Sequence, residues 1–334
     1  MDRDLELVQA WLDFRHHNKG RSSRTSQIYR LAIERLLEFL GDGRSLLTAS
    51  SDELIAFAGA WLAKRNVVAM SRRPYVAAVR DFYRWCVDRG HLRASPAAGL
   101  PYPRASMPLP KVMSLASAEK IMWRPDFTTF VGVRDGAMLQ LLVGCGIRVS
   151  GLVGLNASDV LEQRIDGKPR LFVRVFEKGG RQRMVPVPLE ADLQLRVYLE
   201  HAELKSIDRT LENGDLVLFV TTRNRSCAAA QYKGERRRFN RRGVIAMVKR
   251  YGQQAGIPED QLHPHAMRHL YGTELAESDV DILTRQQLMG HLDPKSTGLY
   301  THLAMRKLVA SVDRGGPLAK MRTPTTDILK KLGT

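Results

Sequence analysis

The chain has 334 residues, which exceeds one typical domain, and its 52 Lys and Arg against 35 Asp and Glu give a formal net charge of +17. The excess is present in residues 1–104 (17 basic against 11 acidic) and in residues 105–334 (35 against 24), so we expect both parts to contact a polyanion, unless the surface is merely basic and well solvated. Three cysteines without paired spacing disfavour a disulfide framework or a zinc site, and the absence of a signal peptide or a long apolar run predicts a soluble, cytoplasmic protein with no membrane partner.

The first hundred residues carry apolar side chains at helical spacing. Serines at N-cap positions and glycines at the ends delimit four predicted helices, at about 4–18, 23–40, 51–65 and 71–89. The last of these places four arginines among its apolar positions: Arg72, Arg73, Arg80 and Arg84. We therefore predict an all-helical basic domain over residues 1–98, with these arginines as contacts to the polyanion.

Residues 95–110 hold five prolines and no apolar period. Proline blocks regular structure and stiffens a connection, so residues 99–111 are predicted to be an interdomain linker.

The second predicted domain, residues 112–316, is mainly α with a small antiparallel β-sheet. Two runs rich in β-formers, 171–176 and 183–187, flank the sequence Glu177-Lys178-Gly179-Gly180, which is typical of a hairpin, and 216–221 is a possible further strand. The expected helices lie at about 116–123, 131–144, 189–205, 240–255, 264–277, 281–289 and 296–312. From Pro317 onward, residues 317–334 are predicted to form an extended tail.

Four short strings in this domain carry side chains suited to a phosphodiester. GCGIRVSGL places Arg148 just after a helix, where its guanidinium can donate hydrogen bonds to two phosphate oxygens at once. EKGG holds Lys178 on a tight turn. In HPHAMRH, His265 and Arg268 stand three residues apart on one helix face. LMGHL contains His291, and Tyr300 follows nine residues later.

These strings, in this order, resemble the tyrosine recombinase (phage integrase) family, whose members include lambda integrase, Cre and the Xer recombinases. The resemblance covers the whole chain and implies a two-domain clamp that cuts and rejoins double-stranded DNA at a recombination site. It implies that Tyr300 is the nucleophile that forms a 3′-phosphotyrosine, and that Arg148 and Arg268 hold the phosphate. Lys178 would protonate the leaving 5′-oxygen, His265 would assist proton transfer at the tyrosine, and His291 would hydrogen-bond the phosphate.

The resemblance also implies four protomers on two DNA sites, exchange through a Holliday junction, and a C-terminal segment that docks on a neighbour. An accessory protein is a possible partner, and no metal, ATP or other cofactor is expected; His263 and His265 lack the cysteine or carboxylate that a zinc site would need. The alternatives are a DNA-binding protein that has kept the clamp without the chemistry, a telomere resolvase or type IB topoisomerase, and a Xer-type dimer-resolution recombinase.

Two departures from the family pattern stand out. Gly151 occupies the position, three residues after Arg148, where the family usually has an acidic residue, and Asp159 is a conceivable substitute. The stretch 223–238 is longer and more basic than usual, which indicates either a solvated loop or an added contact to DNA or to another subunit. The candidate DNA contacts here are Arg236, Arg237, Arg238, Arg241 and Arg242. This stretch and the tail favour a mobile-element recombinase over a housekeeping Xer protein.

Overall fold

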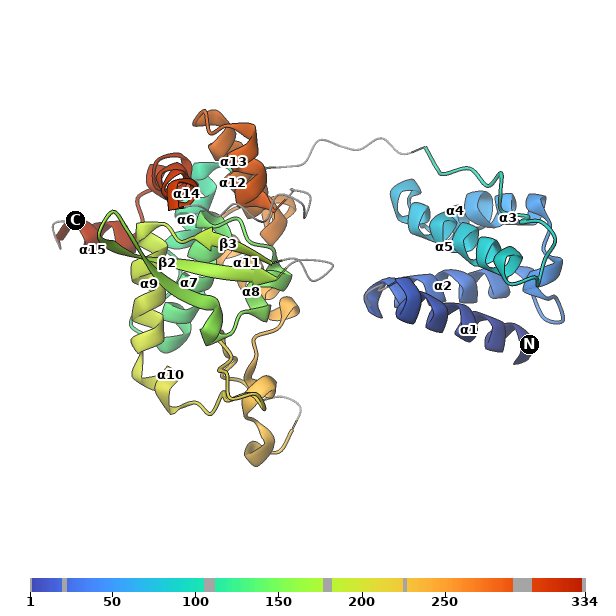
Figure 1. Ribbon diagram of the computed structural model, residues 1–334, viewed down its shortest axis with the longest axis horizontal. Coiled ribbons are helices and arrows are strands. Elements are labelled where there is room, and N and C mark those ends of the chain that lie inside the picture. Colours follow the sequence, from blue (N-terminus) through green and yellow to red (C-terminus); the bar gives the residue numbers. More distant parts are fainter. Residues whose placement is uncertain are drawn as a thin grey trace. The chain divides into compact units, whose positions relative to one another are not determined.

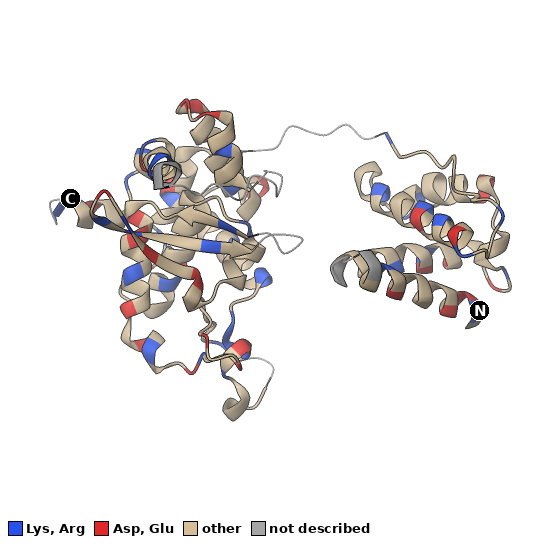
Figure 2. Cartoon of the chain, viewed as in Figure 1, with Lys and Arg blue, Asp and Glu red and all other residues tan. Residues whose placement is uncertain are grey.

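The computed structural model describes residues 2–19, 23–104, 112–176, 182–224, 227–290 and 302–331. The chain divides into two compact units, Met1–Pro108 and Leu109–Thr334 (Figure 1). Each unit has its own hydrophobic core, and Lys and Arg are distributed over both (Figure 2). The finer division into a domain at 1–98, a linker at 99–111 and a domain at 112–316 stays a prediction.

The first unit is helical, as the spacing of its apolar residues predicts. Its helices are α1 (Asp2–Lys19), α2 (Ser23–Leu40), α3 (Ser51–Ala56), α4 (Leu62–Lys64) and α5 (Ala69–Asp88). The segment predicted as a helix at 51–65 is helical from Ser51 to Lys64, and a π-helical turn, Phe57–Trp61, lies between α3 and α4. The rings of Trp11 and Phe82 meet edge to face, with centroids 5.3 Å apart, and join α1 to α5 in the core.

The second unit is built around one buried helix, α7 (Phe130–Gly144), in which every residue but Val131 is buried. The other helices are α6 (Leu115–Met122), α8 (Val149–Gly154), α9 (Leu189–Glu200), α10 (Ala202–Ser206), α11 (Arg241–Gln254), α12 (Pro264–Glu277), α13 (Ile282–Met289), α14 (His302–Gly315) and α15 (Pro324–Lys331). The predicted helix at 189–205 is broken at His201, whose backbone is extended and whose Nδ1 accepts a hydrogen bond from the Glu203 amide. The short helix α8 was not predicted.

A three-stranded antiparallel sheet, in the order β1 (Val160–Ile165), β2 (Lys168–Phe176) and β3 (Gln182–Pro186), completes this unit (Figure 1). The predicted pairing of the two glycine-linked runs is confirmed by β2 and β3, which pair from Phe172↔Pro186 to Phe176↔Gln182. β1 was missed. The strand predicted at 216–221 is wrong, because that segment forms only isolated bridges outside the sheet.

The extended tail predicted from Pro317 is also wrong. A 3-10 turn, Pro317–Lys320, is followed by α15, which packs on α9 of the same unit. Leu318 lies in the hydrophobic core, and the buried Thr325 hydroxyl accepts a hydrogen bond from Gln140 Nε2 at 2.7 Å and donates one to Gln194 Oε1 at 3.3 Å. Burial of apolar surface and paired polar groups therefore hold this segment on its own unit.

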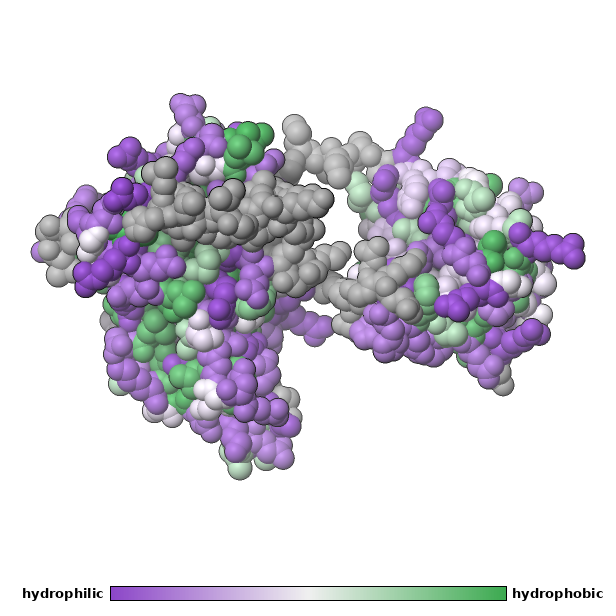
Figure 3. All heavy atoms as spheres, in the orientation of Figure 1, coloured by the Kyte–Doolittle hydropathy of each residue, from purple (hydrophilic) through white to green (hydrophobic). Residues whose placement is uncertain are grey.

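The surface is mostly hydrophilic on the face shown in Figure 3, with a hydrophobic patch over α13. Two residues of that helix, Ile282 and Leu283, are 61% and 64% exposed. None of the described helices is both long enough and apolar enough to cross a membrane.

Candidate active site

Arg148 is placed by a turn that only glycine permits. Gly146 has a φ of +55°, and a Cβ at this position would collide with the ring of Tyr271. The chain leaves α7 through this turn, and Arg148 then occupies the N-cap position of α8 with a half-buried side chain. The sequence prediction that Arg148 follows directly on a helix is correct.

Arg268 lies in α12, which begins at Pro264 and is capped by His263, whose side chain accepts a hydrogen bond from the Ala266 amide. The arginine is 3% exposed. Its Nη1 donates to the carbonyl of Gly146, two residues before Arg148 in the chain, and its Nη2 donates to the carbonyl of Met289 at the end of α13. Arg268 therefore joins three separate elements of the unit.

His265 lies one helical turn before Arg268 on α12. Partial burial lowers its pKa below the usual 6.5, and the electrostatic effects of His269, Arg268, His263 and Arg148 lower it further. The rings of His265 and His269 meet edge to face, with centroids 4.7 Å apart. A lowered pKa keeps His265 neutral at neutral pH, which is the form that can accept a proton.

The structure thus brings the segments of Arg148, His265 and Arg268 together, because Arg268, one turn after His265 on α12, donates to the carbonyl of Gly146, two residues before Arg148. The other three predicted residues, Lys178, His291 and Tyr300, lie outside the described residues. In the part of the chain that is described, no group of three or more His, Cys, Asp and Glu side chains could hold a metal ion.

The position of Gly151 has no room for the acidic side chain that the family usually has there. A Cβ on Gly151 would lie 2.5 Å from Cγ1 of Val175 on β2. Asp159, the suggested substitute, is buried and serves the local fold: its Oδ1 accepts from Arg174 Nε at 2.9 Å and its Oδ2 from the Asn156 amide at 3.0 Å. Both carboxylate oxygens of Asp159 are therefore used within the fold, and Asp159 does not replace the acidic residue of the family.

The basic stretch 223–238 is ordered by internal hydrogen bonds wherever it is described, and Arg238 is at their centre. Its Nη1 donates to the carbonyls of Val153 and Leu155, both at 3.0 Å, its Nη2 to Asn156 Oδ1 at 2.7 Å, and its Nε to the Glu235 carboxylate at 2.7 Å. These contacts use the guanidinium within the domain. The prediction that Arg238 contacts DNA is therefore corrected: it holds this stretch against α8.

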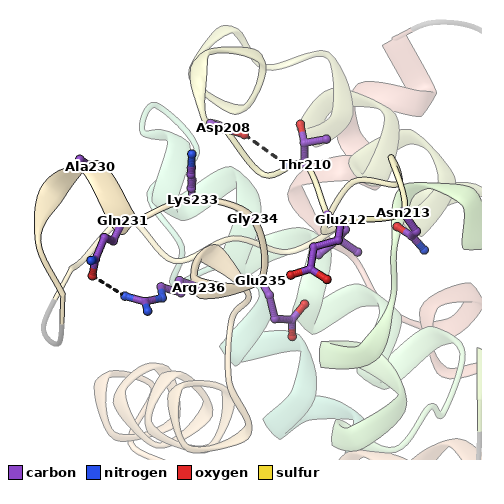
Figure 4. A pocket seen from close by; sticks show the side chains of 11 residues that line it. Asp208, Thr210, Glu212, Asn213, Ala230, Gln231, Lys233, Gly234, Glu235 and Arg236 are labelled. Atoms are coloured by element: carbon purple, nitrogen blue, oxygen red, sulfur yellow. Dashed lines mark hydrogen bonds between the residues drawn. The ribbon is translucent and has the colours of Figure 1, made fainter.

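Among the other arginines of this region, Arg236, Arg241 and Arg242 are exposed, and Arg237 is half-buried. Arg236 is exposed and hydrogen-bonds Gln231, beside a cavity that Lys233, Glu235 and Asp208 also line (Figure 4). Arg237 stacks on Tyr232, with its Cζ 3.7 Å from the ring centroid. Arg241 and Arg242 are exposed in the first turn of α11, and a second cavity of about 550 Å³ at this helix start is lined by arginines, namely Arg134, Arg223, Arg236, Arg238, Arg242 and Arg250.

In the first unit, the predicted DNA contacts also have partners within the chain. Arg72 Nη1 donates to the Gly59 carbonyl at 2.9 Å, within the π-helical turn. Arg73 and Arg80 face the ring of Tyr102 and donate to the carbonyls of Pro103 and Leu100, which fastens residues 100–103 to α5. Arg84 is exposed. Arg72 therefore gives one donor to the fold, its contact with DNA stays a prediction, and Arg84 stays the clearest candidate for DNA.

One residue that the sequence prediction missed is Arg183 of β3, which is 6% exposed and donates to the Leu288 carbonyl in α13. The signal was present in the sequence, since Arg183 falls in line with the apolar Val185 and Val187 at a spacing of two. A charged residue in such a row indicates a buried polar contact.

Comparison with known proteins agrees with this architecture. The model of the phage integrase family matches residues 111–307, and the model of its N-terminal SAM-like domain matches residues 8–90. The tyrosine recombinase XerD of Pseudomonas aeruginosa is 32% identical over 304 residues, which span 90% of this chain and 94% of that protein. The tyrosine recombinase XerC of Xylella fastidiosa is 31% identical over 318 residues, spanning 95% and 98%.

Solved structures with the same fold include a lambda integrase dimer bound to a COC′ core site (TM-score 0.61, 16% identity, 91% of this chain and 76% of that one) and XerH bound to its difH substrate (TM-score 0.60, 16% identity, 83% and 75%). A lambda integrase tetramer bound to a Holliday junction has a TM-score of 0.59 at 17% identity, over 89% and 79% of the chains. With a family model matched over more than half of its length, the chain belongs to the phage integrase family, the tyrosine-type site-specific DNA recombinases.

Proposed function

We propose that this recombinase cleaves and rejoins DNA at a specific site through a 3′-phosphotyrosine formed by Tyr300. The observation that carries the proposal is the meeting of Arg148, His265 and Arg268, which come from two separate segments of the chain. Two guanidinium groups beside a neutral imidazole suit a phosphodiester, since they stabilise charge on its oxygens while the imidazole takes up a proton.

The proposed step is a transfer of the phosphoryl group from one oxygen to another. The phenol oxygen of Tyr300 attacks phosphorus as His265 accepts its proton, and the bond from phosphorus to the 5′-oxygen breaks as Lys178 donates a proton to that oxygen. Arg148 and Arg268 stabilise the negative charge on the non-bridging oxygens, with a hydrogen bond from His291. Rejoining is the reverse reaction, with a 5′-hydroxyl as the attacking group.

The backbone contacts of Arg268 suit this role. Its hydrogen bonds to the carbonyls of Gly146 and Met289 fix the end of the turn that leads to Arg148 and the end of the helix that leads to His291. A transition state is stabilised best by groups whose positions are set before the reaction begins. Arg268 would therefore contribute both its charge and the alignment of its neighbours.

We further propose that the partner is a double-stranded DNA site, held by a core-binding domain at residues 1–98 and a catalytic domain at 112–316, and that four protomers assemble on two such sites. The net charge of +17 and the exposed arginines at the start of α11 support a DNA partner. The DNA-bound relatives, one of them a tetramer on a Holliday junction, support the assembly by analogy. The site of action would be the bacterial nucleoid, in the cytoplasm, with an accessory protein as a possible further partner.

Two biological roles are compatible with this chemistry. A mobile-element role was favoured by the basic stretch 223–238 and by an extended tail, and the tail is in fact packed on α9. A Xer-type role in dimer resolution is supported by the match to XerD and XerC over nearly their whole lengths. The two roles share one cleavage mechanism and differ in the DNA site.

The test is the capture of a covalent complex on a nicked DNA substrate that carries the protein's own site, in buffer with excess EDTA. We expect a denaturation-resistant adduct with the wild type and none with Tyr300→Phe. An adduct that persists in Tyr300→Phe would assign the nucleophile elsewhere. Loss of cleavage in EDTA, restored by Mg²⁺, would contradict the metal-free mechanism, and specific DNA binding without any adduct would favour a catalytically silent DNA-binding protein.

A further inference from the structure

Arg183 is a buried cation within an apolar row of β3. It is 6% exposed, and Val185 and Val187, two and four residues later, are fully buried. A buried guanidinium destabilises a fold unless acceptors satisfy its donors, and an apolar side chain would pack at least as well. The charge at this position therefore indicates a function for the contact that it makes.

That contact is with the end of α13. Arg183 Nη1 donates to the carbonyl of Leu288, and Arg268 Nη2 donates to the carbonyl of Met289. Both carbonyls belong to the last turn of the helix, where they have no partner within the helix itself. Two buried arginines from two different elements, β3 and α12, thus hold one helix end, and Gly290 in the left-handed conformation then ends α13.

The same sheet also holds α14. Arg170 of β2 pairs with Asp313 of α14 through two hydrogen bonds, Nη1 to Oδ2 at 2.5 Å and Nη2 to Oδ1 at 2.7 Å, and its Nη2 also donates to the Val187 carbonyl at 3.1 Å. Arginines on two adjacent strands therefore attach the helices that precede and follow residues 291–301 to one sheet.

We propose that Arg183 is a positioning residue for strand cleavage, which sets the end of α13, and through it His291, relative to the hairpin that carries Lys178. The inference rests on the proposed function, because it takes His291 and Lys178 as members of the cleavage centre. β3 is one strand of that hairpin, and a single residue, Gly290, separates α13 from His291 in the chain. Arg183 acts through the backbone of α13, because its side chain is buried against that helix end.

The experiment is a double-mutant cycle between Arg183→Met and His291→Ala, with adduct formation on the nicked substrate as the rate. Arg183→Met keeps most of the side-chain volume and removes the donors. We expect it to slow cleavage by about 10- to 100-fold, the scale of a misplacement near 1 Å, with little change in DNA affinity. In the His291→Ala background the same substitution should have little further effect, because the two residues act as one unit.

The matched control is Arg209→Met, which removes another arginine of this unit that donates to a backbone carbonyl, that of Val217 at 2.7 Å. It should leave the cleavage rate unchanged, measured below the melting temperature of every variant. If Arg183→Met does not fold, Arg183→Lys replaces it in the cycle. Because lysine retains one donor for Leu288, the loss of rate should be smaller than for a variant without donors, and it should again disappear in the His291→Ala background.

If the losses of cleavage rate in Arg183→Met and His291→Ala multiply in the double variant, Arg183 does not have the proposed role. A loss of rate in Arg209→Met as large as that in Arg183→Met would overturn it as well. A His291→Ala protein that cleaves as fast as the wild type gives a different result. It would refute the place of His291 in the proposed function and, with it, the route from Arg183 to the reaction.

Discussion

Arg183 and Arg268, which hold the end of α13, are 6% and 3% exposed, whereas Arg241 and Arg242, in the first turn of α11, are exposed to solvent. The buried pair donates to backbone carbonyls and fixes elements in place. The exposed pair adds positive charge to a surface. Burial and hydrogen-bond partners therefore decide what an arginine does in this protein, while the composition counts all arginines alike.

This difference can be tested by removing the two arginines of the candidate site, Arg148 and Arg268, and one arginine of the exposed pair, Arg241. Arg148→Ala and Arg268→Ala should each slow cleavage by at least about 100-fold, the cost of losing one preorganised donor to a charged transition state. Arg241→Ala should leave the rate of bound complexes close to that of the wild type. The measurement is single-turnover cleavage at saturating protein, with affinity measured separately.

Arg268 also joins Gly146 to Met289, so its loss is expected to lower the melting temperature as well, whereas Arg148 serves as the cleaner probe. Equal losses of affinity and of rate in Arg148→Ala would make this residue an ordinary phosphate anchor.

Gly151 and Gly154, both in α8, differ in the space available for a Cβ atom. Gly151→Ala should destabilise the fold by about 1–3 kcal/mol, because its Cβ would lie 2.5 Å from Val175 Cγ1 and the core would be overpacked. Gly154→Ala, in the same helix, has no atom within 4 Å of its Cβ and should be neutral or stabilising by up to about 1 kcal/mol. Urea denaturation of both variants measures the difference. Equal stabilities would mean that the position of Gly151 has room for the acidic residue of the family.

Much of the fold follows from the sequence because helical spacing is a strong local signal. The apolar repeats over residues 23–40 and 264–277 have the bounds of α2 and α12. β1 was missed although Asp166-Gly167 marks its turn, in which both residues have positive φ, at 53° and 78°. The tail was misread because the contacts that fold it, from Leu318 and Thr325 to α7 and α9, join residues distant in sequence.

The candidate site was predicted only in part for a related reason. Motif spacing identified Arg148, His265 and Arg268, whose chemistry is encoded in local strings. The same reasoning took Arg238 for a DNA contact, since a basic cluster in sequence does not reveal the carbonyls of Val153 and Leu155 that bind it. Partners distant in sequence are visible only once the chain is folded.

The third prediction separates surface charge from structural charge in the basic stretch. Replacing Arg236, Arg241 and Arg242 by Ala should flatten the dependence of log K on log salt by about 0.9 per lost phosphate contact, while sequence preference is retained. Arg238→Ala should lower the melting temperature and leave the slope unchanged, because its guanidinium binds Val153, Leu155 and Asn156. A flatter slope in Arg238→Ala would restore it as a DNA contact. An unchanged slope in the triple variant, with recombination lost, would point to a contact between subunits.

The last prediction concerns pH and has the smallest expected effect. The pKa of His265 is lowered from 6.5, so the neutral form persists below that pH, and cleavage should fall only as the pH drops through the lowered value. His269→Gln removes a neighbouring imidazole that lowers the pKa of His265, so it should raise that pKa, shift the acid limb of the pH–rate profile to higher pH and slow cleavage at pH 6 by about a few-fold. His17→Gln, which disrupts the exposed His16 and His17 ring pair of the first unit, is the matched control and should leave the profile unchanged. A wild-type acid limb at or above pH 6.5, or one that His269→Gln does not move, would remove His265 as the group that accepts the proton of Tyr300.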